Sequence, residues 1–442
     1  MSGSRTPPRA LNVPSGRLSR LARLSSMATS VAGNMAVTGL RETARGNRPG
    51  VKDLLLTPSN IQRIADDLAR MRGAAMKIGQ LLSMDTGDIL PPELNQIMAR
   101  LRADADYMPP KQLKVVLNKN WGNSWLQKFE RFDVRPLAAA SIGQVHRAKT
   151  RDGRDMAIKV QYPGVARSID SDVATVAALI KVSGLLPRGF ELKPYMEEAL
   201  RQLREEADYE REGQCLRDFR QRLQDDDTFV VPEFYEDFTT KHVLAMSYIG
   251  SRPIEDAVDL DQTRRNRIAE SLVTLLLREL FDFRFMQTDP NFANYRFDPQ
   301  TDRLVLLDFG ATRHFQRKFV DQYRRLFQIG LAGDSDGLRT LAHEIGFIAP
   351  ETAPHHQQAL LEMIETAFAA FRDHNTFDFG NTALIQKMNA AGRALASDGF
   401  VPPPVPLDVL YLHRKLGGTF LLANRLKAQL PIRDIVGRFV TP

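Results

Sequence analysis

The residues best suited to chemistry stand in two short segments, residues 289–294 and Asp308-Phe309-Gly310. In the first segment, Asp289 is followed five positions later by Asn294, and the second segment begins with another aspartate, Asp308. One aspartate can act as a general base, while Asn294 and Asp308 offer the oxygen ligands that Mg²⁺ or Mn²⁺ takes beside nucleotide phosphates. This set indicates metal-assisted phosphoryl transfer, with ATP as the donor and ADP as the product.

The segment between the two groups, residues 295–307, reads as a β-hairpin. Residues 295–297 favour one strand, residues 298–302 have turn chemistry, and residues 304–307 form a second, apolar strand. Because a hairpin returns the chain to the edge from which it started, Asn294 and Asp308 are predicted to lie side by side.

A second set of candidate residues lies upstream and ends at Lys159. Met156-Ala157-Ile158-Lys159 has the pattern of the strand that carries the phosphate-pairing lysine in kinases. Asp152-Gly153, a dipeptide favoured in hairpin turns, precedes this strand. Before the turn, residues 138–145 (the alanine loop) align with the kinase phosphate loop G-x-G-x-x-G-x-V, with Ala138 and Ala140 in place of the first two glycines.

The two alanines change what this loop can do. Each adds a Cβ atom where backbone would approach phosphate, and each disfavours positive φ. We therefore expect a stiffer loop that holds phosphates differently from a glycine loop. A small-residue turn without a ligand is the alternative, but the ordered set of catalytic candidates downstream favours nucleotide binding. The loop residues expected to line the nucleotide are Ala138, Ala139, Ala140, Ser141, Ile142, Gly143 and Val145.

These motifs resemble those of the UbiB family of atypical kinases (ABC1 type), and most closely its branch that supports coenzyme Q (ubiquinone) biosynthesis. The motifs that carry the resemblance occur in family order, from about residue 55 to 315: Lys77-Ile78-Gly79-Gln80, the alanine loop, residues 157–164, Glu206-Ala207-Asp208, residues 287–294 and Asp308-Phe309-Gly310. The wider family often has His-Ala before the catalytic aspartate. This chain has Gln287-Thr288 there, as the coenzyme-Q-supporting branch does.

The resemblance implies roles for further residues of the site. Lys159 is expected to pair with the α and β phosphates while a helix carboxylate holds it, and Glu212 is our choice for that carboxylate. Glu206 then belongs to the E-x-D motif and is expected to meet Lys77. Lys77 and Gln80 share a helix face. In this family their helix folds over the site where a protein substrate would dock, so both are counted among the catalytic candidates.

The implied activity is ATP hydrolysis or phosphoryl transfer that assists ubiquinone biosynthesis at a membrane. The expected partners are a membrane surface or a lipid or quinone intermediate, other ubiquinone-biosynthesis proteins, and a second copy in a homodimer. The expected location is cytoplasmic, peripheral at the inner membrane, or the mitochondrial matrix in a eukaryotic source. A kinase with a protein or small-molecule acceptor, and a catalytically silent nucleotide-binding scaffold, stay open as alternatives.

Composition agrees with a large globular protein. The chain has 442 residues, of which 43% are hydrophobic, and a single cysteine, Cys215, which excludes an intrachain disulfide framework. No apolar run reaches the roughly 18–20 residues that a membrane span needs. Residues 1–50 contain eight arginines and one acid, Glu42, so this segment carries a charge equal to the formal net charge of +7. The remainder has no basic excess, and nucleic-acid binding is not expected.

Residues 17–45 place leucine, methionine and valine at steps of three and four beside the arginines, which predicts an amphipathic helix. Three roles stay open for this helix: docking on its own protein, lying on a membrane surface, or serving as a mitochondrial-type transit segment.

The order of predicted elements gives an α+β, two-lobed protein-kinase-like fold with an N-terminal helical extension. We predict a basic extension over residues 1–50, a helical segment carrying the K-x-G-Q motif over 51–130, an N-lobe over 131–250 and a helical C-lobe over 251–442. Residues 229–235 and 242–248 are predicted to be strands. The second is expected to be the hinge between the lobes, with Met246 and Tyr248 contacting the nucleotide. Ala311-Thr312-Arg313-His314 leads quickly toward a helix at Lys318, so a long activation loop is not evident.

Overall fold

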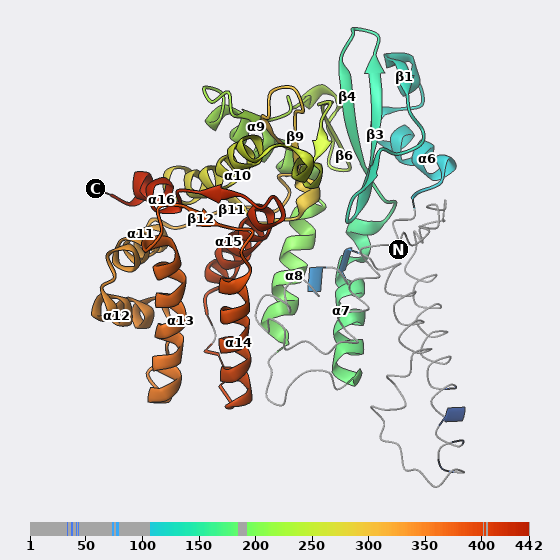
Figure 1. Cartoon of the computed structure of the whole chain (residues 1–442). Coiled ribbons are helices and arrows are strands. Elements are labelled where there is room, and N and C mark those ends of the chain that lie inside the picture. The colour runs from blue at the N-terminus through green and yellow to red at the C-terminus, as the bar shows by residue number, and fades with distance from the viewer. Residues whose placement is uncertain are drawn as a thin grey trace. The chain divides into compact units, whose positions relative to one another are not determined.

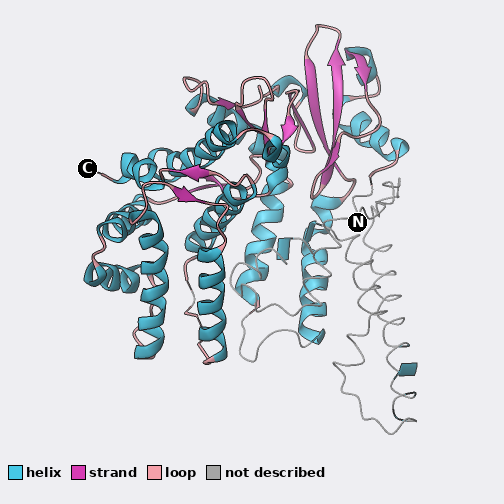
Figure 2. Cartoon of the chain, viewed as in Figure 1, coloured by secondary structure: helices cyan, strands magenta, loops and turns pink. Residues whose placement is uncertain are grey.

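The computed structural model describes residues 107–183, 192–400, 402–403 and 405–441, together with residues 33, 37, 38, 41, 43, 73, 74, 77 and 78. The chain divides into two compact units. Unit 1 comprises Met1–Arg217 and Glu233–Tyr248, and unit 2 comprises Asp218–Pro232 and Ile249–Pro442. Both units contain helices and strands (Figure 2).

Unit 1 contains an antiparallel sheet in the order β1-β3-β4-β6, with the short strand β2 paired to β3 (Figure 1). Its strands are β1 (Phe129–Phe132), β2 (Ala138–Ala139), β3 (Gly143–Thr150), β4 (Asp155–Gln161) and β6 (Val243–Ser247). Strands β3 and β4 form a hairpin whose turn contains Gly153 at φ 95°, a conformation that glycine adopts without strain. Lys159 lies on β4 between Val145 of β3 and Leu244 of β6. The lysine therefore projects from an inner strand of the sheet.

An aromatic cluster closes one face of this sheet. Helix α6 (Pro110–Trp121) begins with a proline, which is tolerated in the first helical turn because its missing N–H would be unpaired there. Trp121 of α6 packs on Phe129 and Phe238 at ring-centroid distances of 5.5 and 5.8 Å, and its Nε1 donates to the Phe238 carbonyl at 2.9 Å. Buried residues of β4, including Ile158 and Val160, join the same core. This packing gives Lys159 a fixed backbone.

Three helices follow the sheet hairpin: α7 (Val165–Ser183), α8 (Lys193–Glu206) and α9 (Tyr209–Arg222). Helices α7 and α8 lie side by side (Figure 1). Helix α8 buries Ala199 and Leu203, which are four residues apart and so share one helix face. The chain then turns, and Asp208 accepts a hydrogen bond from the Arg211 N–H at 3.1 Å, in the manner of an N-cap. The E-x-D motif thus ends α8 with its glutamate and starts α9 with its aspartate.

Unit 2 contains a sheet in the order β5-β10-β9-β7. Its strands are β5 (Phe229–Val230), β7 (Arg252–Pro253), β9 (Tyr295–Phe297) and β10 (Leu304–Leu306). Strands β9 and β10 are antiparallel, with Leu306 opposite Tyr295, and the Leu307 N–H donates to the Asn294 carbonyl at 3.1 Å. The predicted hairpin over residues 295–307 is confirmed. Its strand pairing places Leu307, the residue before Asp308, beside Asn294.

The rest of unit 2 is mainly helical. Its helices are α10 (Gln262–Leu277), α11 (Arg317–Ala332), α12 (Ser335–Ile345), α13 (Pro354–Arg372), α14 (Ala383–Ser397), α15 (Leu407–Arg425) and α16 (Ile432–Val440). Helix α10 continues into a π-helical turn, Arg278–Phe283, which ends at Arg284 with φ 51°. Two short strand pairs join the helices: β8 (Phe285–Gln287) with β11 (Thr312–His314), and β12 (Phe377–Asp378) with β13 (Gln429–Leu430).

Some sequence expectations need correction or fall outside the described residues. The strand predicted over 229–235 stops after Val230, because Pro232 cannot donate to a strand ladder. The pairing of β8 with β11 was not predicted. Gln80 lies outside the described residues, as does most of the predicted amphipathic helix over 17–45. Within that range the structure describes residues 33, 37, 38, 41 and 43, and these are helical. Among the described residues, none of the helices combines the length and the apolar character needed to cross a bilayer.

Candidate phosphoryl-transfer site

Lys159 forms a buried ion pair with Glu212 in unit 1. Its Nζ atom lies 2.8 and 2.9 Å from the two carboxylate oxygens of Glu212, and the side chains are only 10% and 2% exposed. The Lys159 Nζ also lies 5.1 Å from the centre of the Tyr209 ring, one turn earlier in α9. The structure thus joins Lys159 to the glutamate chosen from the sequence. Such a pair holds a lysine in place for nucleotide phosphates.

The alanine loop is a tight turn between β2 and β3. Ala138 and Ala139 are exposed and pair with Val145 and Gln144, while the Ala140 N–H donates to the Gly143 carbonyl at 2.8 Å. A Cβ atom at position 143 would lie 2.5 Å from the Val160 carbonyl oxygen, so a glycine is required there. Of the two alanines that stand where kinase loops have glycine, Ala138 is exposed and Ala140 is half-buried, while Gly143 packs on β4.

Glu206 connects the alanine loop to the K-x-G-Q segment. It accepts a hydrogen bond from the Ser141 Oγ at 3.0 Å and forms an ion pair with Lys77. Lys77 is helical and only 4% exposed, so it does not belong to a solvated helix face. A Cβ atom on Gly73 would lie 2.8 Å from a methyl group of Ile142, which places this helix directly against the loop. Lys77 and the alanine loop are therefore parts of one site in unit 1.

The two residues predicted at the hinge have different surroundings. Met246 is 5% exposed and stands opposite Ala157 within the sheet, so its side chain belongs to the core. Tyr248 follows the end of β6, where the guanidinium of Arg147 lies 4.0 Å from its ring centre. The Tyr248 N–H donates to the Asp155 carbonyl at 2.9 Å, so the backbone at this position is paired as well. Contact of Met246 and Tyr248 with a nucleotide stays a prediction.

Unit 2 holds the second group of predicted residues. The Thr288 N–H donates to the Ala311 carbonyl at 3.0 Å, and the Asn294 side-chain amide donates to the Asp289 carbonyl at 3.2 Å. The second bond closes the loop 289–294 (the catalytic loop) on itself, and the first ties the residue before the loop to the segment that follows Gly310. The Asp308 carboxylate accepts the Gly310 N–H at 3.0 Å, and this aspartate follows the strand that pairs with β9. Asp289, Asn294 and Asp308 thus gather at one end of the β9–β10 hairpin.

Phe309, between Asp308 and Gly310, is 2% exposed. Its ring lies 4.9 Å from that of Phe219, which in turn lies 5.1 Å from that of Phe285. The hydroxyl of Thr312, the first residue of β11, donates to the Phe309 carbonyl at 2.7 Å. Aromatic packing and this turn fix the backbone on which Asp308 stands.

The donor set fits a hard divalent cation. A carboxylate from Asp308 and an amide oxygen from Asn294 are the kinds of ligand that Mg²⁺ and Mn²⁺ take when they bridge nucleotide phosphates. Such an ion would neutralise the charge of the phosphates. Asp289 lies on the same loop as Asn294, and a carboxylate there is of the type that can accept a proton from an attacking hydroxyl or water.

A known protein family matches the part of the chain that carries both groups of residues. The ABC1 atypical kinase-like domain matches residues 100–342, which include Lys159, Glu212 and the catalytic loop. The chain belongs to the ABC1 atypical kinase family. It is 37% identical over 421 residues to the mitochondrial atypical kinase COQ8 of Saccharomyces cerevisiae. The aligned region covers 95% of this chain and 84% of that protein. It is 36% identical over 427 residues to the mitochondrial atypical kinase COQ8B of Danio rerio, covering 96% of this chain and 68% of that protein.

The fold comparison gives the same architecture. The solved complex of Rv3197 with erythromycin, from Mycobacterium tuberculosis, aligns with 92% of this chain and 99% of that chain, with a TM-score of 0.59 and 22% identity. The prediction of an α+β, protein-kinase-like fold is therefore confirmed, as is the assignment to the ABC1 family and to enzymes of the kinase or ATPase type.

The structure places two further residues, Arg414 and Lys415 of α15, beside the catalytic loop, and the sequence analysis missed both. Arg414 Nη2 donates to Asp289 Oδ1 at 2.5 Å. Lys415 Nζ donates to the Gln287 carbonyl at 2.8 Å. A Cβ atom on Gly418 would lie 2.2 Å from Pro290, so the helix backbone packs directly on the catalytic loop. Helix α15 thus contacts the loop on both sides of Asp289, although it lies beyond the family match.

Lys415 also belongs to a buried polar network. Its ammonium contacts the Tyr295 hydroxyl at 2.7 Å and Glu279 Oε2 at 2.9 Å, and Lys415 and Glu279 are each 1% exposed. Burial opposes the charge on Lys415, but the neighbouring Glu279 carboxylate raises the pKa of the lysine above its usual value. Lys415 therefore stays charged and holds the strand that leads into the catalytic loop.

A sequence signal for α15 did exist. Arg414 and Lys415 are followed by Gly417-Gly418 in a mainly apolar stretch, and positions 414, 415 and 418 lie on one helix face. A fully buried lysine needs polar partners, but the sequence alone does not say that these partners are Gln287 and Glu279.

Proposed function

We propose that this protein is an ATP-dependent atypical kinase or ATPase that assists ubiquinone biosynthesis at a membrane. The similarity to mitochondrial COQ8 atypical kinases over most of both chains is the observation that carries the proposal. Two sets of residues support it, because Lys159 with Glu212 in unit 1, and Asp289, Asn294 and Asp308 in unit 2, are of the types that phosphoryl transfer requires. ATP and ADP, with Mg²⁺ or Mn²⁺, are the proposed ligands.

The proposed roles follow from position and chemistry. Lys159, held by Glu212, pairs with the α and β phosphates, and the alanine loop lies along them. Asp308 and Asn294 hold the metal ion, and Asp289 acts as the base. Lys77, with Gln80 on the same segment, restricts access of a protein acceptor to the alanine loop; this favours ATP hydrolysis or phosphorylation of a small acceptor. The pairing of Lys77 with Glu206 supports that restriction, because it ties the segment to the loop.

The metal assignment predicts a clear loss in Asp308→Asn. For the wild-type protein, Mg-nucleotide at 100 times its Kd should stabilise the folded state by about 2.7 kcal/mol. The asparagine removes one anionic metal ligand, so this metal-dependent stabilisation should largely disappear. Thermal unfolding with ADP or ATP, in Mg²⁺ and in EDTA, measures the effect.

Asp321→Asn, an exposed change on α11, serves as the matched control and should behave as wild type. An Asp308→Asn protein stabilised by Mg-nucleotide as fully as the control would contradict the assignment. Quinone profiling of cells lacking the protein, rescued by the wild-type or the Asp308→Asn gene, then tests the ubiquinone role. Phosphoryl transfer to added protein would favour a true protein kinase, and no ATP turnover at all would favour a silent scaffold.

We further propose a peripheral position at the inner membrane, on its matrix side in a eukaryotic source, with ubiquinone-biosynthesis proteins and a lipid or quinone intermediate as partners. The relatives named above are mitochondrial proteins. The stripe over residues 17–45, flanked by arginines, provides the contact, and each arginine near an anionic surface adds about 1 kcal/mol.

Flotation with liposomes tests this contact. Full-length protein should float with anionic liposomes at low salt, and a protein comprising residues 46–442 should float less, because it lacks the arginine-rich stripe. Salt should weaken the binding by screening. Equal flotation of both proteins, independent of salt and anionic lipid, would place the membrane contact elsewhere.

A further inference from the structure

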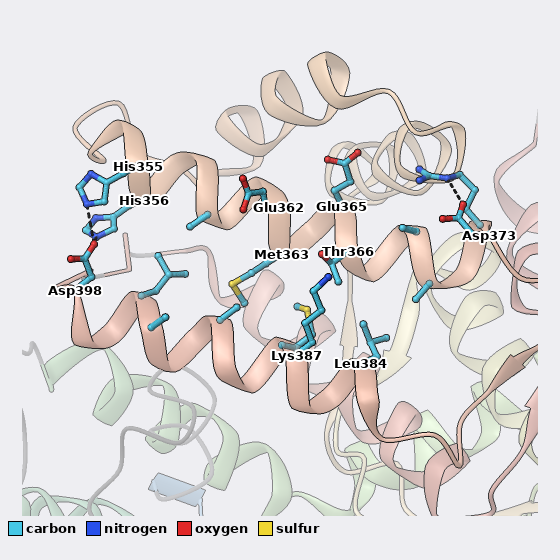
Figure 3. A pocket seen from close by; sticks show the side chains of 18 of the residues that line it. His355, His356, Glu362, Met363, Glu365, Thr366, Asp373, Leu384, Lys387 and Asp398 are labelled. Atoms are coloured by element: carbon cyan, nitrogen blue, oxygen red, sulfur yellow. Dashed lines mark hydrogen bonds and ion pairs between the residues drawn. The ribbon is translucent and has the colours of Figure 1, made fainter.

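Helices α13 and α14 carry a group of potential metal ligands, and none of its members belongs to the residues proposed for nucleotide binding (Figure 3). His355 and His356 lie in the first turn of α13, and Asp398 follows the last residue of α14 as its C-cap. The Nε2 atoms of His355 and His356 lie 3.1 and 3.0 Å from the same oxygen, Oδ2 of Asp398. In the part of the chain that the structure describes, this is the group of three whose ligand atoms all lie within 4.8 Å of one another.

The three side chains combine a fixed position with access from outside. His356 is only 12% exposed, and its ring packs on Phe400 at 5.3 Å and on His355 at 4.0 Å between ring centres. His355 and Asp398 are 64% and 62% exposed, so an ion can reach the cluster. One ligand is therefore preorganised, and the other two need only small rotamer adjustments.

The electrostatic setting of Asp398 favours a cation. The C-terminal end of a helix carries partial negative charge, which opposes a carboxylate placed there. Hydrogen bonds from the two imidazoles do not by themselves cancel the negative charge of this carboxylate. A divalent ion bound by all three groups would do so.

The cluster lies where it can control a groove. Residues 373–382 connect the C-terminal end of α13 to the N-terminal end of α14. The cluster lies at the opposite ends of the two helices, as Figure 3 shows. Between the helices is a cavity of about 880 Å³. Its wall includes the apolar side chains of Met363, Leu384 and Met388, with Lys387 and Glu362 among the polar residues.

We propose that His355, His356 and Asp398 bind a divalent transition-metal ion of the Zn²⁺ type. The ion would link the N-terminal end of α13 to the C-terminal end of α14. Imidazole nitrogen suits such ions, whereas Mg²⁺ and Ca²⁺ take oxygen ligands. Three protein ligands leave a fourth position for water or a small ligand at the end of the groove. Binding would hold this end of the groove at one width and order the first turn of α13.

The test uses the full-length chain, freed of metal with a chelator and titrated with Zn²⁺ against a chromophoric competitor. His355→Ala, His356→Ala and Asp398→Ala should each weaken binding by at least about tenfold, since even the loss of outer-shell support weakens metal sites by that factor. His374→Ala is the matched control, because His374 lines the same groove outside the cluster. Asp308→Asn is a second control, because it removes the metal ligand proposed at the nucleotide site.

The expected result is one tight Zn²⁺ per chain in wild type, His374→Ala and Asp308→Asn. Co²⁺ in the same site should show the visible absorption of low-coordinate nitrogen and oxygen ligation, and Zn²⁺ should slow amide exchange over residues 354–362 in wild type but not in Asp398→Ala. Wild type without a tight site, or cluster variants that bind as wild type does, would overturn the proposal. Because Asp308→Asn retains this site, failure here leaves the proposed function intact, and the reverse also holds.

Discussion

Replacing Lys415 with methionine is expected to lower the free energy of unfolding by about 3–5 kcal/mol, the range for removing one partner of a buried ion pair. The ammonium contacts three oxygens, on Gln287, Tyr295 and Glu279, at 2.7 to 2.9 Å. Lys415 and Glu279 are each 1% exposed, so water cannot take over these contacts. Methionine keeps the length of the side chain but leaves the Glu279 carboxylate without its cation.

The loss should depend on pH. Burial raises the pKa of Glu279 above its ordinary value of 4.5, and Lys415 opposes that rise. Without Lys415 the folded carboxyl holds a proton more readily than the unfolded one does. Between pH 4.5 and the raised folded pKa, the folded state binds more protons, so its stability falls as pH rises. The deficit of Lys415→Met should therefore be smallest at or below pH 4.5 and should grow toward neutral pH.

Denaturant unfolding at several pH values measures this deficit. Lys318→Met, an exposed change on α11, is the control and should stay within about 0.5 kcal/mol of wild type. Adding Glu279→Gln to Lys415→Met removes the uncompensated charge and should recover part of the loss. A Lys415→Met protein as stable as Lys318→Met at neutral pH would show that this pair does not stabilise unit 2.

The sequence could predict those parts of the fold that depend on the pattern of residues within one short segment. The hairpin over 295–307 has alternating apolar residues around a turn, and its strands formed as expected. Strands β8 and β11 are only three residues each and are separated by the catalytic loop and the β9–β10 hairpin. Their pairing depends on tertiary contacts rather than on local propensity, so no short window of sequence could indicate it.

The same distinction applies to the site. Lys159, Asp289, Asn294 and Asp308 stand in motifs whose spacing encodes their chemistry, and so they could be chosen from sequence. Arg414 lies 125 positions from Asp289, and its contact arises only when α15 packs on Pro290. The buried fraction of Lys415 likewise depends on packing, because a lysine in a helix is most often solvated.

Arg414 is expected to act on catalysis through Asp289, and a double-variant comparison can show it. The loop 289–294 has no lysine or arginine of its own, and Arg414 supplies a guanidinium to Asp289 Oδ1 at 2.5 Å. This contact fixes one carboxylate oxygen and orients the other. Asp289→Asn should lower ATP turnover by about 10²–10⁴-fold, the range for loss of a general base. Arg414→Gln should lower it by about 10–100-fold, because misplacement of a catalytic group by about 1 Å can cost that much.

If Arg414 acts only by positioning Asp289, the losses of ATP turnover in Asp289→Asn and Arg414→Gln should not combine in the double variant. The double variant Asp289→Asn/Arg414→Gln should turn over ATP no more slowly than Asp289→Asn alone, since no oriented base is left to disturb. Arg425→Gln, an exposed change on the same helix, should leave kcat and KM near wild type. Steady-state ATP hydrolysis by the full-length proteins measures all four variants. A double variant slowed by the product of the two single losses would mean that Arg414 acts on the nucleotide independently of Asp289, and the positioning role would be wrong.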